Sequence, residues 1–266
     1  MNSRIMLVVG DKFASYAQGK DAITVSQLRG LLSFPAQFLP GQGRIKLIPG
    51  QGMGDQCIAK LLGEATHSPN REHFDFSLWH QLPKRASQAL THKHREENRL
   101  ISEPRQLSED VYELHLMIDE EGELMHDHQS GQHVQGMLLI EAVRQATVAI
   151  TESYYIQTTG IDYAFVLNDM SVKYNNFSFP VPATITCRVV DKSLDNPRRL
   201  SFSMEADVVQ CGACVSSLTF AIAAMDKERI HRQENRQAQK AQQHHMQFFA
   251  ATEAELDEPV SLTPIH

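Results

Sequence analysis

The sequence has few cysteines, no excess of positive charge and no long hydrophobic run. Four cysteines in 266 residues are too few for a disulfide framework. The formal net charge of −7 argues against a nucleic-acid-binding surface, which needs clustered cationic side chains. The longest apolar run, residues 220–225, is far below the roughly 20 residues that cross a bilayer. The run at 5–9 is too short for a signal-peptide core. We therefore expect a cytoplasmic protein that binds neither nucleic acid nor membrane.

What the chain does contain is enough apolar residues for a sizeable core. Hydrophobic residues make up 42% of the 266 residues, which fits one or two domains. Changes in composition divide the chain into three parts, residues 1–80, 85–225 and 226–266, with a polar, linker-like segment at 65–85. The last part is rich in Gln, Arg, His and Glu. It predicts a solvated helix over 226–247, followed by a disordered tail of about 15 residues.

The first part alternates strand-like and helix-like runs. Strands are predicted at 5–9 and 45–48, and helices at 25–32 and 56–64, which together form a small α/β unit. A glycine-rich turn, Gly50-Gln51-Gly52-Met53-Gly54-Asp55, joins the second strand to the second helix. It has two interpretations, a nucleotide-binding turn or a plain turn. Asp55 stands where the dinucleotide fingerprint has its third glycine, and its charge would repel a pyrophosphate, so the plain turn is favoured.

The second part predicts an α+β domain. Residues 112–118 alternate apolar and polar side chains like a half-buried strand. A helix follows over 136–155, and then four β-rich runs at about 163–173, 183–192, 199–210 and 213–224. The helix is apolar on nearly every face, which predicts burial. A sheet wrapped around a single buried helix is the hot-dog arrangement.

Polar side chains interrupt this apolar helix. Glu141 precedes Arg144 by three residues and Gln145 by four, so all three share one face. Buried charges are rare unless they are paired or functional. Two interpretations remain open: a self-satisfied ion pair, or a pocket wall in which Glu141 is an acid or base and Arg144 its charge partner or a ligand clamp. Gly136 at the helix start favours the pocket, because a ligand could approach the free amides there.

A histidine-rich loop precedes the helix, from Met125 to His133. Its spacing matches no common zinc motif, and no cysteine is near, so we expect no metal. A histidine that positions or protonates a substrate is favoured, with His128 and His133 as candidates, and ordinary loop hydrogen bonding is the alternative. Elsewhere, Cys211-Gly212-Ala213-Cys214 lies between two β-rich runs. It is better explained by a hairpin turn than by a redox pair.

The helix and the histidine loop together resemble a known family. His126-Asp127-His128, followed by His133-Val134-Gln135-Gly136-Met137-Leu138-Leu139-Ile140-Glu141-Ala142-Val143-Arg144-Gln145-Ala146, resembles the signature of the A-factor biosynthesis hot-dog family. Thr91-His92-Lys93 looks like the segment that opens each repeat of that family. The helix motif is also similar to that of β-hydroxyacyl-carrier-protein dehydratases, but the ending Arg144-Gln145 favours the A-factor family.

The resemblance implies γ-butyrolactone signal synthesis, in which a β-ketoacyl group moves from acyl carrier protein to a hydroxyl of a dihydroxyacetone-phosphate-like acceptor. The substrate would be an acyl-carrier-protein or coenzyme A thioester, and no cofactor is implied. Carried over by position, the catalytic candidates are Glu141, Arg144, His128 and His133, and the substrate-binding candidates are Gly136, Gln145, His92 and Lys93.

The sequence departs from the family pattern at two points. The family usually has two hot-dog repeats, whereas this chain has one, which implies a homodimer with sites at the subunit interface. Residue 135 is Gln where Pro often precedes the glycine. Two other functions stay open: a hot-dog dehydratase or thioesterase, and a non-catalytic protein that binds an acyl group or signal.

Overall fold

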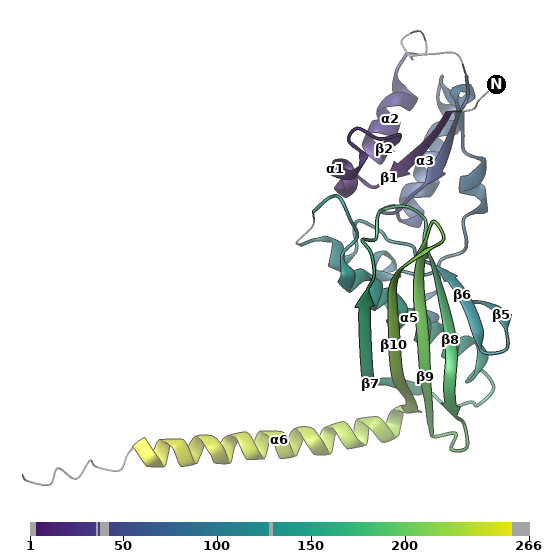
Figure 1. Ribbon diagram of the computed structural model, residues 1–266. Helices are drawn as coiled ribbons and strands as arrows, with labels where there is room; N and C mark the ends of the chain where they lie inside the picture. Colours follow the sequence, from purple (N-terminus) through teal and green to yellow (C-terminus); the bar gives the residue numbers. More distant parts are fainter. Residues whose placement is uncertain (1–3, 36, 38–42, 128–129, 257–266) are drawn as a thin grey trace, which may run out of the picture.

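The computed structural model describes residues 4–35, 37, 43–127 and 130–256, with the backbone alone for 250–256. Figure 1 shows three parts in chain order: a parallel α/β unit, an antiparallel sheet with one long helix against it, and a helix that projects from the far end of that sheet. His128 and residues 1–3 lie outside the described residues, and so does most of the predicted tail.

The N-terminal unit is a four-stranded parallel sheet with the order β2-β1-β3-β4. Its strands are β1 (Arg4–Val9), β2 (Ala22–Thr24), β3 (Ile45–Pro49) and β4 (Phe74–Asp75). Its helices are α1 (Ala14–Ala17), α2 (Val25–Ser33) and α3 (Asp55–His67). Thr24 and Gln27 start α2 with a capping box, in which each side chain bonds the other's backbone amide. Val8, Leu28, Leu47 and Leu61 form a fully buried core between sheet and helices.

The polar segment 65–85 is not a linker, so that prediction was wrong. It contains the end of α3, strand β4 and a 3-10 turn over Ser77–Gln81. Trp79 is 3% exposed, and its indole N–H donates to the Leu47 carbonyl at 3.1 Å. The segment is polar outwards but anchored by buried aromatics, so it belongs to the N-terminal unit.

The second part is a six-stranded antiparallel sheet with the order β5-β6-β8-β9-β10-β7. The strands are β5 (Arg105–Ser108), β6 (Val111–His115), β7 (Tyr163–Tyr174), β8 (Thr184–Ser193), β9 (Arg199–Gln210) and β10 (Ala213–Asp226). The long helix α5 (Gly136–Tyr154) buries eleven residues, and a short helix, α4 (Gln88–Thr91), packs beside it. The α+β hot-dog arrangement predicted from the sequence is confirmed.

β7 follows α5 in the chain but lies at the edge of the sheet, paired on one side with β10 alone. The four predicted β-rich runs are β7 to β10. The turn between β9 and β10 is Cys211-Gly212, with φ of 50° and 78°, as in a two-residue hairpin. The hairpin interpretation of the two cysteines therefore fits the structure.

The glycine turn after β3 packs against the hot-dog domain. Gln51 is 4% exposed, donates to the Leu116 carbonyl at 2.9 Å and accepts the Ile118 amide at 2.8 Å. A Cβ on Gly54, at the start of α3, would lie 1.8 Å from an Asp119 carboxylate oxygen. A carboxylate of the chain therefore fills the space where a phosphate would bind. The structure supports the plain-turn interpretation.

Two buried or half-buried cations complete the joint between the units. The Lys12 ammonium donates to the carbonyl oxygens of Glu120 at 2.6 Å and Met125 at 2.9 Å. The Arg85 side chain is 3% exposed and pairs with Asp55 at 2.9 Å. Both cations join the two units, and the Lys12 bonds hold the loop from 119 to 127 against the N-terminal unit.

The last element is α6 (Lys227–Leu256), longer than the helix predicted over 226–247. Ile230 is buried at its first turn, and every described side chain from 231 to 249 is exposed. Figure 1 shows α6 leaving the sheet on the side of β7. Among the described residues, no helix has the length and apolar character needed to cross a membrane.

Candidate functional site

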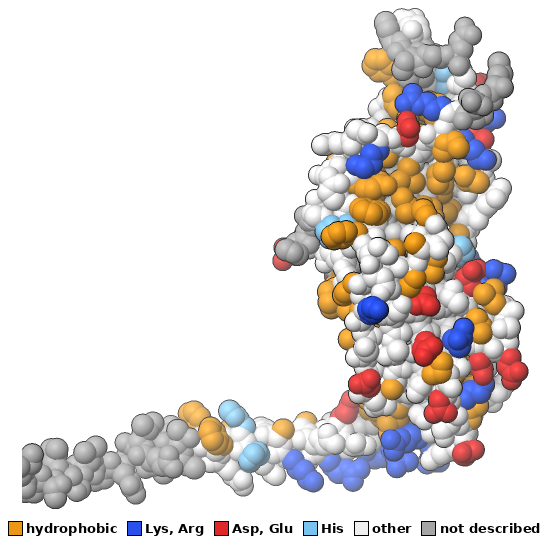
Figure 2. Space-filling model, in the orientation of Figure 1, with side chains coloured by type: hydrophobic (Ala, Val, Ile, Leu, Met, Phe, Trp, Pro, Cys, Tyr) orange, Lys and Arg blue, Asp and Glu red, His pale blue; other side chains and the backbone are white. Residues whose placement is uncertain are grey.

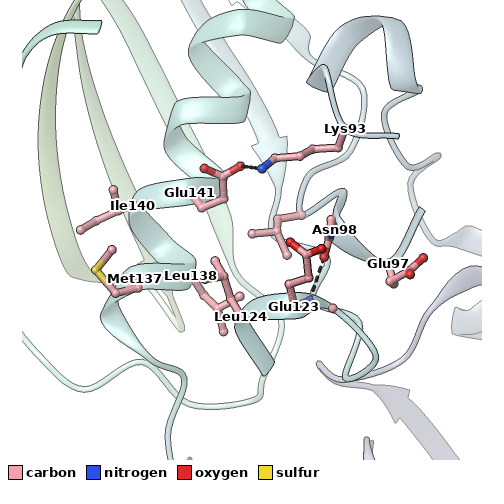
Figure 3. Close-up of a pocket in the computed structure, with 11 residues that line it drawn as sticks. Lys93, Glu97, Asn98, Glu123, Leu124, Met137, Leu138, Ile140 and Glu141 are labelled. Carbon is pink, nitrogen blue, oxygen red and sulfur yellow. Dashed lines mark hydrogen bonds and ion pairs between the residues drawn. The ribbon is translucent and has the colours of Figure 1, made fainter. Parts of the chain in front are cut away.

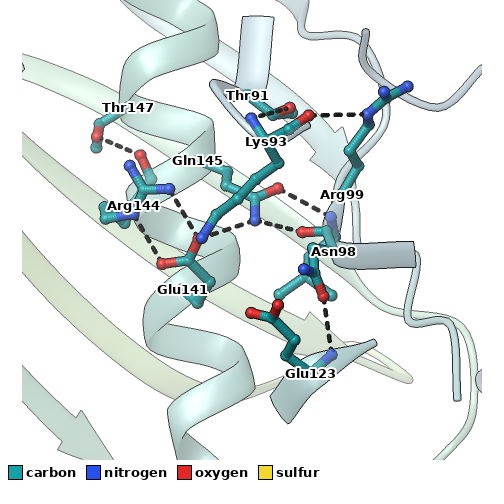
Figure 4. A network of polar contacts seen from close by, with 10 residues as sticks. Thr91, Lys93, Asn98, Arg99, Glu123, Glu141, Arg144, Gln145 and Thr147 are labelled. Atoms are coloured by element: carbon teal, nitrogen blue, oxygen red, sulfur yellow. Dashed lines mark hydrogen bonds and ion pairs between the residues drawn. The ribbon is translucent and has the colours of Figure 1, made fainter. Parts of the chain in front are cut away.

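The polar face of α5 forms a closed network around one carboxylate (Figure 4). Arg144 binds Glu141 with two parallel bonds, Nε to Oε2 and Nη2 to Oε1, both 2.7 Å. Gln145 donates to Oε1 at 3.0 Å, and the Lys93 ammonium approaches Oε1 to 2.9 Å. The helical spacing foreseen from the sequence brings three of these groups together. Lys93 reaches them from the segment that follows α4.

The surroundings hold Glu141 in its ionised form. Burial by itself raises the pKa of this carboxyl. The hydrogen bonds and charge of Arg144, together with hydrogen bonds from Gln145 and Lys93, outweigh burial and lower the pKa to about 2. A carboxylate of such low basicity is a weak proton acceptor at neutral pH, and its acid form is not populated there. In the structure, Glu141 holds the Arg144 guanidinium and the Lys93 ammonium in place.

Gln145 ties this network to the neighbouring chain segment. Its side chain is fully buried, its amide donates to the Asn98 carbonyl at 2.8 Å, and its oxygen accepts the Leu100 amide at 2.9 Å. Asn98 in turn accepts the Glu123 amide at 2.8 Å. Gln145 therefore positions protein backbone, and its polar atoms are already used.

A cavity of about 190 Å³ opens beside the network (Figure 3). Its lining is mostly apolar and includes several charged side chains; the lining residues are Lys93, Glu97, Asn98, Leu100, Gly122, Glu123, Leu124, Met137, Leu138, Ile140 and Glu141. Lys93 and Glu141 have partly exposed side chains, 33% and 18%. The lining carboxylates Glu97 and Glu123 both face Arg95, at 3.7 and 3.4 Å. This first cavity presents a Lys93 ammonium in a mostly apolar lining.

His92 and Lys93 are neighbours in the sequence, but their side chains point in different directions. His92 has φ of 55°, in the left-handed region, and turns its ring away from Lys93. The His92 ring contacts Glu152 at 3.0 Å and packs edge-on against Phe165. Glu152 lies eleven residues after Glu141 on α5, about 16 Å along the helix. Of the pair expected to bind substrate, the structure brings Lys93 to the network and leaves His92 outside it.

A second cavity of about 610 Å³ lies at the start of α5. Met137 lines both cavities. His133 and Gly136 line the second one, together with Val134, Leu139, Tyr174, Asn175, Asn176, Phe177 and Ser178. The His133 ring is hydrogen-bonded to the Ser130 hydroxyl at 3.0 Å and packs on Phe177. The two cavities therefore flank the first turn of the helix.

Gly136 packs closely against strand β7. A Cβ there would lie 2.5 Å from the Tyr174 hydroxyl oxygen and 2.6 Å from its ring. The space left by the missing side chain is taken by Tyr174, which lines the second cavity beside Gly136. Gln135 does not cap the helix with its side chain, which donates instead to the carbonyls of Leu124 and Asp127.

A comparison with protein families agrees with this geometry. The model of the A-factor biosynthesis hotdog domain matches residues 75–226, more than half of the 266 residues. The chain belongs to this family. The matched range contains both cavities and the Glu141 network of the A-factor hot-dog domain, and it begins at strand β4 of the N-terminal unit.

Comparison with individual proteins finds solved structures of low sequence identity. No curated protein matches the sequence. The A-factor hot-dog domain is similar to the dehydratase heterocomplex ApeI:P from Xenorhabdus doucetiae, at 14% identity over 53% of this chain and 93% of that one, with a TM-score of 0.44. It is also similar to a hypothetical thioesterase from Streptococcus pneumoniae with coenzyme A, at 15% identity over 47% and 85%, with a TM-score of 0.35. A conserved protein from Pseudomonas aeruginosa is 19% identical over 46% and 87%, with a TM-score of 0.35.

Two residues beside the Glu141 network and the second cavity were not predicted from the sequence. Tyr174 and Asn98 carry no pattern that marks them, because each reaches the site through strand pairing or a loop. His128 lies outside the described residues. His126 contacts the Gly122 carbonyl at 2.8 Å within its own loop. Among the described residues, no three His, Cys, Asp or Glu side chains gather as a metal would need.

Proposed function

We propose that this protein is an acyl-thioester enzyme that transfers an acyl group from a carrier-protein or coenzyme A thioester to a hydroxyl acceptor. The observation that carries the proposal is the Lys93–Glu141–Arg144 network above an apolar cavity. Membership of the A-factor hot-dog family supports the same substrate class. The particular reaction, transfer rather than hydrolysis or dehydration, rests on the chemistry below.

Lys93 is the group that would meet the thioester carbonyl. Its ammonium contacts Glu141 at 2.9 Å and also lines the first cavity. A fixed cation beside a carbonyl oxygen stabilises the negative charge that develops there during acyl transfer. Glu141 and Arg144 act as positioning residues, because the saturated carboxylate orients Lys93 without itself exchanging protons.

His133 is the candidate for proton transfer. It lines the second cavity, beside the start of α5. An imidazole nitrogen can accept the proton of an attacking hydroxyl and return it to the departing thiolate. In this scheme the new ester C–O bond forms as the C–S bond breaks, and the proton moves from acceptor oxygen to sulfur.

We assign different parts of the substrate to the two cavities. The first, at about 190 Å³, is smaller than the roughly 300–1,000 Å³ typical of sites for larger ligands, and we assign it to a short acyl chain. The second, at about 610 Å³, has room for the pantetheine arm and the acceptor. The thioester would then lie over Met137, which lines both.

We also propose a homodimer joined through β7. This strand has twelve residues, and its outer edge bears no strand within the described part of the chain. Leu167 and Met170 in its middle are 46% and 40% exposed. Long, apolar edges are rarely left open in soluble proteins. Antiparallel pairing with a second β7 around a twofold axis would cover them.

The test is product analysis by mass spectrometry after incubation with a β-ketoacyl thioester, with and without a phosphorylated hydroxyl acceptor. Acyl transfer predicts an ester that appears only with acceptor. Free acid would identify a thioesterase. In a parallel incubation with a β-hydroxyacyl thioester, an enoyl product would identify a dehydratase. Lys93→Met and His133→Asn should lower turnover by about 10²-fold or more, while the matched surface variant Lys84→Met should not.

One observation favours a second function, the binding of an acyl group without turnover. Glu141 accepts three hydrogen bonds within the protein and contacts the Lys93 ammonium, as in a structural ion-pair network. A binding protein would show saturable affinity for the acyl thioester and no product of any kind. In that case Lys93→Met would weaken binding and change nothing else.

A further inference from the structure

Helix α6 has a firm root and an unsupported length. The Lys227 amide donates to the Asp162 carbonyl at 3.0 Å, its ammonium pairs with the Asp162 carboxylate at 3.0 Å, and Ile230 is 8% exposed. These contacts fix the direction in which the helix leaves the sheet. Thirty residues extend about 45 Å, and most helices depend on tertiary packing of one face for their stability.

The two sides of α6 differ. Arg229, Arg232, Arg236 and Lys240 recur at spacings of three or four and share one face. Ile230, Ala238, Ala241 and Phe249 lie on the opposite face, which also carries Glu234 and His245. Figure 2 shows blue side chains along the inner half of α6 and orange ones farther out. We call the face with Ile230, Ala238, Ala241 and Phe249 the apolar face. Of these four residues, Ile230 already packs on the domain.

The opposite end of the hot-dog domain has the matching feature. Met137, Tyr174, Phe177 and Phe179 are 57%, 51%, 69% and 40% exposed, and the first three line the second cavity. We call these four residues the cavity rim. Monomeric proteins seldom leave such apolar side chains clustered in water, so a cluster of this kind marks an interaction surface.

Symmetry brings these two features together. β7 starts at Tyr163, beside the root of α6, and ends at Tyr174, on the cavity rim. In an antiparallel pair of β7 strands, the beginning of one lies level with the end of the other. A second copy on this edge therefore turns its cavity rim towards the root of α6, and α6 projects on that same side (Figure 1).

From this we infer that α6 of one copy docks by its apolar face on the cavity rim of a second copy and closes that copy's second cavity. The inference rests on the dimer of the proposed function, and it extends that dimer by making each site depend on the other chain. Ala238, Ala241 and Phe249 contact the rim, and the cationic face stays in water.

Hydrogen–deuterium exchange of the whole protein tests the contact without any assay of activity. A docked α6 predicts slow amide exchange over 231–249 and over 174–179. Ala238→Glu with Ala241→Glu should remove protection from both segments. Gln243→Glu with Gln247→Glu adds the same charge on the other face and should leave both protected. Rapid exchange of α6 in the unaltered dimer would overturn the inference, as would protection of 174–179 that the apolar-face variant does not change.

Cross-linking separates this inference from the dimer itself. Within one chain, Lys173 lies about 33 Å along β7 from the root of α6, beyond the reach of a short amine-reactive linker. In a mixture of ¹⁵N-labelled and unlabelled protein, a mixed-isotope link between Lys173 and Lys227 reports edge pairing alone. A mixed link between Lys173 and Lys240 that disappears in the apolar-face variant reports docking. The first link without the second keeps the dimer and refutes the docking of α6; a monomer in sedimentation refutes both.

Discussion

Removal of the Glu141 charge should destabilise the protein in a pH-dependent way. The pKa of this carboxyl falls from 4.5 to about 2 in the folded protein, and its side chain is 18% exposed. A difference of about 2.5 pKa units corresponds to about 3 kcal/mol of stability. Because the folded pKa is depressed, this contribution is fully present above the unfolded pKa and is lost as the pH falls towards the folded one.

The assay is urea unfolding of the native chain and of Glu141→Gln at pH 7, 5 and 3. The gap in unfolding free energy should be about 3 kcal/mol at pH 7, nearly the same at pH 5, and less than half at pH 3. Glu103→Gln is the control. It removes one partner of an exposed pair with Lys84 and should cost at most about 1 kcal/mol. A gap for Glu141→Gln that is the same at all three pH values would refute the electrostatic account.

Three further predictions concern packing at the site and the joint. Gly136→Ala should destabilise the protein by about 1–3 kcal/mol in thermal unfolding, because Tyr174 occupies that space; if Tyr174→Ala does not restore part of this loss, the packing account is wrong. Gln145→Leu should cost about 2–4 kcal/mol in urea unfolding and speed exchange of the Leu100 amide, which loses a buried partner. Burial raises the pKa of Asp119, so its ionisation costs stability at neutral pH. Asp119→Asn should raise the melting temperature at pH 7. The gain should shrink as the pH falls through the raised pKa of the folded state and vanish below the pKa of the unfolded state. A gain that is constant with pH would contradict this.

Much of the hot-dog domain could be predicted because its signals are local. Each strand from β7 to β10 is a long β-rich run bounded by turn residues, and α5 is a long apolar run without a breaker. The pairing of Glu141 with Arg144 and Gln145 follows from helical spacing alone. Such patterns depend on residues a few positions apart, so a single sequence contains them.

The rest depended on contacts between distant residues. Lys93 meets Glu141 across 48 positions, and the choice of Lys93 over His92 depends on one left-handed backbone angle. The segment 65–85 looked like a linker because its outward side chains are polar, although Trp79 anchors it inside. Tyr174 reaches Gly136 because β7 crosses to the edge of the sheet, a topological fact that no local pattern encodes.

The bonds from Lys12 to the loop over 119–127 bear on how the chain can be dissected. The family match begins at residue 75, which invites expression of a shortened protein. Such a fragment would lose the ammonium that bridges Glu120 and Met125, and it would strand Arg85 without Asp55. Arg85 would keep its bonds to the carbonyls of Arg99 and Met117 but lose its carboxylate partner, which destabilises the fragment. The hot-dog domain therefore depends on the N-terminal unit for part of its stability. Inactivity of the shortened protein would then reflect this loss of stability and would not test the proposed reaction.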